Sequence, residues 1–190
     1  MRANKTALRT VLHWYDFLCP FCYVGQHRTA ILVRHGLRVV ELPFQAHPDI
    51  PPRGIAAGPR TGPMFAMLER EAREAGLALN WPPRLPDTRR ALAAAEWTRR
   101  HHPSAFPQFH KDMFAAHFVL GEDLEDSAVI ARHASGAGID VAALHAVLAT
   151  AVPRSASTKP RRLAARMAFK GRRPGCWRAD DPETSPGGGI

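Results

Sequence analysis

Cys19 and Cys22 are the residues of this chain whose type and spacing most directly suggest chemistry. Two cysteines separated by two residues, between the apolar run 11–18 and a stretch with helical character, have the layout of a thiol–disulfide exchange site. A cysteine at a helix N-terminus is favoured as the thiolate by the unpaired N–H groups and the helix dipole. A second cysteine one turn later can close a disulfide or resolve a mixed one. The spacing therefore predicts a working dithiol.

Pro20 supports this interpretation, because its missing N–H would have no partner in the first turn of a helix. The alternative is half of a zinc site, since CxxC pairs also bind metal. A second CxxC or a well-spaced histidine pair would then be expected, and the only other cysteine is the distant Cys176. The sequence therefore favours redox chemistry over metal binding and predicts no metal and no organic cofactor.

The length of 190 residues corresponds to one domain, or one domain with an insertion, that can bury a real core. Residues 1–12 contain no apolar stretch long enough for a signal peptide, and no segment approaches the length of a membrane helix. We therefore expect a cytoplasmic protein without a membrane partner. In that compartment a CxxC pair is more often a working dithiol than a structural bridge.

The net charge of +9 is concentrated near the C-terminus. Residues 154–178 hold nine Lys/Arg and no Asp/Glu, whereas residues 1–150 hold 17 Lys/Arg against 14 Asp/Glu. The main part of the chain thus carries an excess of only three positive charges and lacks the basic stripe that follows phosphates. We expect no nucleic-acid partner.

Hydrophobic patterning predicts a strand over residues 9–17, a helix over 22–35 that stops at Gly36, and a second strand over 37–44. A strand–helix–strand unit of this length implies parallel strands, as in the first half of a thioredoxin-like fold. The core positions predicted in this helix are Val24, Ile31 and Leu32.

Residues 46–60 are rich in proline and glycine and are predicted to form a loop. The chain then has helical character to about residue 150. The predicted helices span 63–75, 87–100, 104–119, 126–135 and 140–150, with aspartates opening several of them. One helical face is rich in aromatic residues and is predicted to be core: Phe106, Phe109, Met113, Phe114, His117 and Phe118.

The ten histidines show no metal-binding spacing. His101, His102 and His110 lie near a helix start without an i, i+4 pair, so a metal site built from them is disfavoured. His47 follows the second predicted strand and is expected to be an ordinary loop residue, although it could approach the dithiol.

The segment 15–25, with the sequence Y-D-F-L-C-P-F-C-Y-V-G, is similar to the D-x-x-C-P-W-C-Y-x-G segment of the DsbA-like thioredoxin-fold oxidoreductases, in particular their FrnE-like branch. Further similarity lies in residues 42–51 and 114–124, and the resemblance covers about residues 9–150. It implies a thioredoxin-like α/β fold with a large α-helical insertion.

The same resemblance implies that Cys19 is the attacking thiolate and Cys22 the resolving thiol, while Pro20 and Phe21 shape the site. Phe21 stands where the family more usually has tryptophan, a mild change within an apolar pair. The related 2-hydroxychromene-2-carboxylate isomerases act with glutathione and generally have serine at the position of Cys19. Two cysteines favour redox chemistry, with a glutathione-dependent isomerase or transferase as the alternative.

Residues 151–190 depart from the family. The resemblance implies an antiparallel strand pair, a closing helix and a cis-proline turn facing the dithiol, but this segment contains five prolines and no strand-length apolar run. Its composition predicts disorder. The strands and helix that complete the fold are therefore expected to be lost.

A shifted reading frame would explain this loss. In the frame that starts at each codon's third base, residues 167–178 permit G-V-Q-G-T-P-A-W-L-L, which matches a cis-proline turn and its strand. Its first glycine and last leucine are forced by the genetic code, and the other positions are only permitted. We hypothesise a frameshift near residues 151–157, which would make Cys176 accidental.

The sequence therefore predicts three parts: a βαβ half with the CPFC site over 1–45, a helical insertion over 46–150, and an aberrant tail over 151–190. The predicted activity is dithiol–disulfide exchange with protein or small-molecule thiols and disulfides. The alternatives left open are the glutathione-dependent enzyme, an inactive remnant, a non-enzymatic partner-binding module and a metal-binding protein.

Overall fold

The computed structural model describes residues 9–151. The chain divides into two units, Met1–Ser157 and Thr158–Ile190, and all described residues belong to the first. Almost all of the predicted tail over 151–190 therefore lies outside the described residues. None of the helices in the described part is long and apolar enough to span a membrane.

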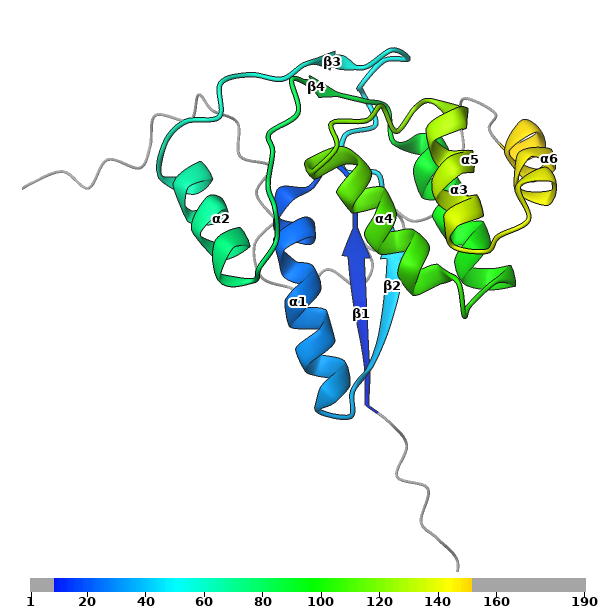
Figure 1. Ribbon diagram of the computed structural model, residues 1–190, viewed down its shortest axis with the longest axis horizontal. Coiled ribbons are helices and arrows are strands. Elements are labelled where there is room, and N and C mark those ends of the chain that lie inside the picture. Colours follow the sequence, from blue (N-terminus) through cyan, green and yellow to red (C-terminus); the bar gives the residue numbers. More distant parts are fainter. Residues whose placement is uncertain (1–8, 152–190) are drawn as a thin grey trace, which may run out of the picture. The chain divides into compact units, whose positions relative to one another are not determined.

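The first three elements form the predicted strand–helix–strand unit. Strand β1 (Thr10–Tyr15) pairs in parallel with β2 (Arg38–Pro43), in a register that runs from Thr10 opposite Arg38 to Tyr15 opposite Pro43. Helix α1 (Pro20–Arg34) connects the two strands. The parallel crossover expected from the sequence is confirmed, and the dithiol segment follows the carboxyl end of β1 (Figure 1).

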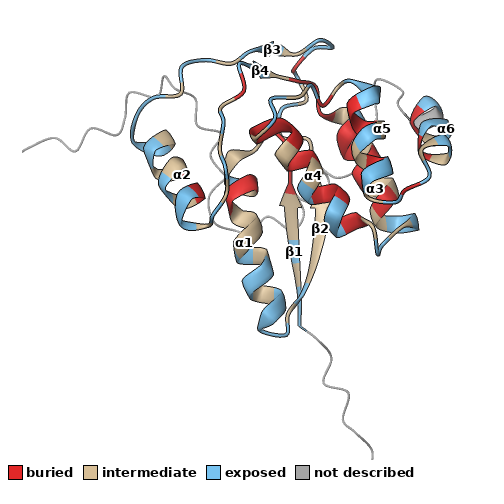
Figure 2. Cartoon of the chain, in the orientation of Figure 1, coloured by how far each residue is buried: buried red, intermediate tan, exposed pale blue. Residues whose placement is uncertain are grey.

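Helix α1 is buried only at its start. Tyr23 and Val24 are buried, whereas Ile31 and Val33 are 37% and 55% exposed. The prediction of a core position is therefore confirmed for Val24 and wrong for Ile31. Figure 2 shows the same contrast: α1 is buried near its start and becomes intermediate or exposed toward its end, whereas buried residues gather on α3, α4 and α5.

The remaining helices match the predicted helical insertion. They are α2 (Pro63–Glu74), α3 (Arg89–His101), α4 (Phe106–Phe118), α5 (Ser127–Gly136) and α6 (Val141–Ala151). The predicted cap at Asp126 is confirmed, because its carboxylate accepts from the N–H of Ala128 at 2.8 Å. The N-cap residue of α3 is Thr88 and not the predicted Asp87, but the carboxylate of Asp87 accepts from the N–H of Arg89, the first residue of the helix, at 3.0 Å.

A short antiparallel pair was not expected. Strand β3 (Ile55–Ala56) pairs with β4 (Arg84–Leu85) within segments rich in glycine and proline. Two-residue strands so far apart in sequence leave no periodic pattern, so the prediction of an unbroken loop over 46–60 is corrected here.

The core centres on α4, whose aromatic face is buried as predicted. Phe109, Met113 and Phe114 are fully buried. The ring of Phe17, just before the dithiol, lies 5.0 Å from that of Phe114, and the ring of Tyr23 stacks on Phe118 at 4.8 Å. The helical insertion therefore packs directly against the two ends of the dithiol segment.

Candidate active site

Cys19 is the N-cap residue of α1, and Cys22 lies in the first turn of that helix. The backbone N–H of Cys22 donates to Cys19 Sγ across 3.4 Å. A tight turn leads into the helix, because the N–H of Cys19 donates to the carbonyl oxygen of Asp16 at 2.9 Å. Both cysteines are half-buried free thiols. The structure thus brings the two predicted catalytic residues together at a helix N-terminus.

The two thiols differ in acidity. The hydrogen bond from the side chain of Cys22, with N–H donors of Cys22 and Phe21, lowers the pKa of Cys19 from 9.0 to about 7 against the opposing effect of burial. The same side-chain hydrogen bond and burial raise the pKa of Cys22. Near neutral pH, Cys19 is therefore the thiol that ionises and Cys22 the thiol that keeps its proton.

Pro20 and Phe21 separate the two cysteines. Pro20 occupies the first helical position, where its ring is compatible with the backbone and no N–H is required. The side chain of Phe21 is 47% exposed beside the thiols. An exposed aromatic ring at this position can contact a molecule that approaches Cys19.

A buried carboxylate lies three residues before Cys19. Asp16 is only 2% exposed. Its Oδ1 accepts from the N–H of Leu18 at 3.2 Å and from Thr88 Oγ1 at 2.9 Å, and its Oδ2 accepts from the N–H of Ala46 at 2.8 Å. Burial raises the pKa of Asp16, and these hydrogen bonds oppose the effect.

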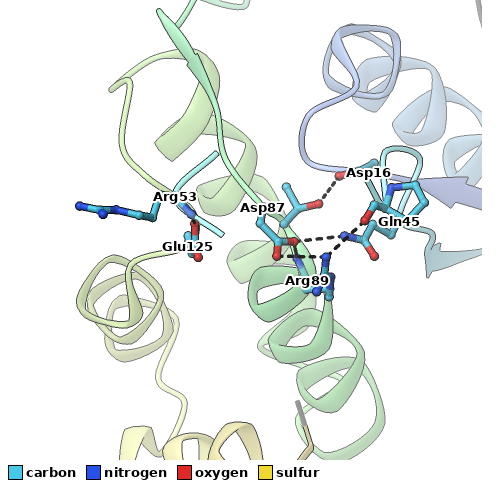
Figure 3. A network of polar contacts seen from close by, with 8 residues as sticks. Asp16, Gln45, Arg53, Asp87, Arg89 and Glu125 are labelled. Atoms are coloured by element: carbon cyan, nitrogen blue, oxygen red, sulfur yellow. Dashed lines mark hydrogen bonds and ion pairs between the residues drawn. The ribbon is translucent and has the colours of Figure 1, made fainter. Parts of the chain in front are cut away.

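Further polar contacts join the same segments beside Asp16 (Figure 3). Gln45 donates to Asp87 Oδ1 at 3.1 Å, and Arg89 pairs with the Asp87 carboxylate at 3.4 Å. Arg89 also donates to the carbonyl oxygen of Pro48 at 3.3 Å. The loop after β2 is therefore tied to the start of α3 at several points.

A second ionisable pair lies on the strands. His13 and Glu41 are opposite each other in the register of β1 and β2, and His13 Nδ1 lies 2.5 Å from Glu41 Oε2. The hydrogen bond to Glu41 raises the pKa of His13, with a smaller contribution from the charge of Cys19. The charge of Cys19 therefore acts on His13 in the same direction as Glu41.

The fold and the paired cysteines agree with a match to a protein family: the family model of the DsbA-like thioredoxin domain covers residues 10–171. The chain belongs to the DsbA-like thioredoxin domain family. No curated protein matches the chain significantly.

Several solved structures share the fold of this DsbA-like chain. A probable DsbA oxidoreductase from Streptomyces coelicolor is 22% identical, with a TM-score of 0.64, and the match covers 86% of this chain and 77% of that one. The cytosolic disulfide reductase DsbM from Pseudomonas aeruginosa, solved with GSH, is 19% identical, with a TM-score of 0.58, and the match covers 85% of this chain and 82% of that one. A 2-hydroxychromene-2-carboxylate isomerase is 21% identical, with a TM-score of 0.56, and the match covers 74% of this chain and 71% of that one.

The histidines of this DsbA-like chain have separate environments. His47 is exposed in the loop after β2. His110 is buried among aromatic rings, 4.4 Å from the ring of Tyr15, and burial lowers its pKa to about 4. His101 and His102 flank Trp97 at the end of α3. Within residues 9–151, no group of three or more His, Cys, Asp or Glu side chains is arranged to hold a metal.

Sequence reasoning singled out the two cysteines of the candidate site in this DsbA-like chain but gave no role to Asp16, His13 or Glu41. The pairing of His13 with Glu41 could have been found by aligning the two predicted strands, since parallel register places them opposite each other. The bond from Thr88 to Asp16 joins residues 72 positions apart, and no local pattern indicates it.

Proposed function

We propose that this protein is a thiol–disulfide oxidoreductase that works through Cys19 and Cys22. The observation that carries the proposal is the capping position of Cys19, whose Sγ accepts the N–H of Cys22 and whose pKa is lowered to about 7. About half of Cys19 is then thiolate at neutral pH, compared with roughly one per cent for an ordinary thiol of pKa near 9.

In the reductive direction, the Cys19 thiolate attacks one sulfur of a substrate disulfide. The substrate S–S bond breaks, a mixed disulfide forms, and the first substrate thiolate leaves and takes up a proton. Cys22 then loses its proton and attacks Cys19 Sγ, which releases the second substrate thiolate. The substrate gains two electrons and the protein gains a Cys19–Cys22 disulfide; the oxidative direction is the reverse.

This chemistry needs no metal or organic cofactor, and its partners are protein or small-molecule thiols and disulfides. A reducing compartment such as the cytoplasm would return the dithiol to its thiol form after each turnover. The similarity in fold to DsbM, named as a cytosolic disulfide reductase, supports this location for the proposal.

Insulin reduction by dithiothreitol tests the proposal. We expect activity in the parent protein, loss of activity in Cys19→Ser, and retained activity in Cys176→Ser as the matched thiol control. Equal activity of the parent and Cys19→Ser would refute it. No activity in any of these proteins would support the inactive remnant.

A glutathione-dependent isomerase or transferase is the second candidate, because a 2-hydroxychromene-2-carboxylate isomerase shares the fold. That reaction does not require a resolving thiol. Saturable glutathione binding with activity that persists in Cys22→Ala would favour this candidate, whereas dithiol exchange requires Cys22.

A further inference from the structure

Asp16 is a buried acid whose position calls for an explanation. A carboxylate with 2% exposure has lost its hydration, which is costly unless the protein replaces it. Within the described residues, this carboxylate accepts hydrogen bonds from three neutral donors: the N–H groups of Leu18 and Ala46 and the hydroxyl of Thr88. An apolar side chain would avoid that cost but could not accept these three hydrogen bonds.

The three donors come from three separate segments. Leu18 belongs to the turn that carries Cys19, Ala46 to the loop after β2, and Thr88 is the N-cap residue of α3. The carbonyl oxygen of Asp16 also accepts the N–H of Cys19 itself. Asp16 therefore connects the turn that carries Cys19 to the loop after β2 and to the start of α3. Its backbone carbonyl and its carboxylate both take part.

The charge of Asp16 also acts on the thiols. It raises the pKa of Cys19 and of Cys22, because a negative charge nearby disfavours a second one. His47, in the loop after β2, lowers the pKa of Asp16 and so favours its charged form, against the larger effect of burial. The carboxylate thus opposes the helix-terminus donors that stabilise the Cys19 thiolate.

We propose that Asp16 is a positioning residue for the dithiol: its carboxylate holds the turn that carries Cys19 in place, and its buried negative charge limits the fraction of Cys19 present as thiolate. This inference rests on the proposed function for its meaning in catalysis. Its test uses the reactivity of the thiol alone, so it can fail independently of any exchange activity.

The variant Asp16→Asn separates the charge from most of the hydrogen bonding. The amide oxygen can still accept from Leu18 and Thr88, while the amide N–H₂ faces the N–H of Ala46 and loses that bond. The variant Thr88→Val is complementary, since it removes one donor and leaves the charge. The variant Asp49→Asn gives the same change in net charge at a solvent-exposed position of the loop after β2.

The measurement is the pH dependence of Cys19 alkylation by iodoacetamide, in proteins that carry Cys176→Ser. For Asp16→Asn we expect the midpoint to fall from about 7 by at least a few tenths of a pH unit, a rise of roughly twofold or more in the thiolate-to-thiol ratio. The equilibrium of the disulfide form with glutathione should move toward the dithiol by a similar factor. Thr88→Val should lower the melting temperature without lowering the midpoint, and Asp49→Asn should change neither.

A midpoint that stays at the parent value in Asp16→Asn would overturn the proposal, because Asp16 would then be a structural residue only. An unchanged melting temperature in both Asp16→Asn and Thr88→Val would overturn the positioning role. If Asp16→Asn does not fold, Thr88→Ser decides the positioning role: it should restore the stability lost in Thr88→Val. The charge is then tested by Asp16→Ser, which removes it and should lower the midpoint, so an unchanged midpoint in that variant would overturn the proposal.

Discussion

Replacing Cys22 should change the acidity of Cys19 in a way that depends on the replacement. The pKa of Cys19 is lowered from 9.0 to about 7, which corresponds to about 3 kcal/mol in favour of the thiolate, and the side chain of Cys22 is the largest cause. Alanine at this position removes the S–H donor, whereas serine keeps a donor of similar reach. The backbone N–H that donates to Cys19 Sγ is present in both variants.

If the S–H donor supplies half of the shift, Cys22→Ala raises the pKa of Cys19 by about one unit. The thiolate fraction at pH 7 then falls from about one half to about one tenth, and the alkylation rate falls about fivefold. Cys22→Ser should keep a midpoint near 7. The assay is iodoacetamide alkylation from pH 5 to 10, checked by thiolate absorbance in the ultraviolet.

Identical midpoints near 7 in Cys22→Ala and Cys22→Ser would refute this reasoning. The helix N-terminus alone would then account for the acidity of Cys19. A midpoint near 9 in both variants would also contradict it, because the hydroxyl of serine would have failed to replace the thiol as a donor.

Three further predictions concern the surroundings of the dithiol. Burial lowers the pKa of His110 and His117 from 6.5 to about 4. Below pH 6.5 the unfolded chain therefore binds protons that the folded protein does not, and the free energy of unfolding should fall by about 3 kcal/mol for each histidine as the pH drops to 4. Urea unfolding at pH 4.5 and 7 should show this loss, and the double variant His110→Phe, His117→Leu should be much less sensitive to acid. Glu41→Gln should lower the pKa of His13, measured by NMR titration, because Glu41 is the largest cause of its raised value; an unchanged midpoint would contradict the pairing. Phe21→Ala should change stability by less than about 0.5 kcal/mol and slow exchange with a protein disulfide more than with a small one, while equal slowing would argue against substrate contact.

The sequence predicted those parts of the fold that follow from local patterns. The strand–helix–strand unit and the aromatic face of α4 were predictable because periodicity and turn residues specify them within a few residues. The prediction that Ile31 is a core residue was wrong for a physical reason. A helical pattern shows which positions are apolar, but only the packed chain shows whether another element covers them. The pairing of β3 with β4 was not predicted, because strands of only two residues leave no periodic pattern in the sequence.

The candidate site divides in the same way. The spacing of Cys19 and Cys22 indicates the chemistry directly, because the reaction requires two thiols one helical turn apart. The groups that adjust those thiols come from distant segments: Thr88 reaches Asp16 across 72 positions, and Glu41 reaches His13 across the sheet. Such contacts depend on tertiary packing, so a single sequence does not show them.

The frameshift stays a prediction, and the structure indicates which property of the protein it should leave unchanged. Within residues 9–151 the sheet that carries the dithiol consists of β1 and β2 alone, and Leu12 of β1 and Val33 of α1 are exposed. The donors that lower the pKa of Cys19, however, all come from Phe21 and Cys22. A chain with the frame restored near residues 151–157 should therefore gain stability and exchange activity while keeping an alkylation midpoint near 7. A midpoint shifted by a full unit would show that the altered segment acts on the thiol itself. Sequencing of the coding DNA decides the premise: an alternative frame without a G-x-x-G-x-P turn would refute the frameshift.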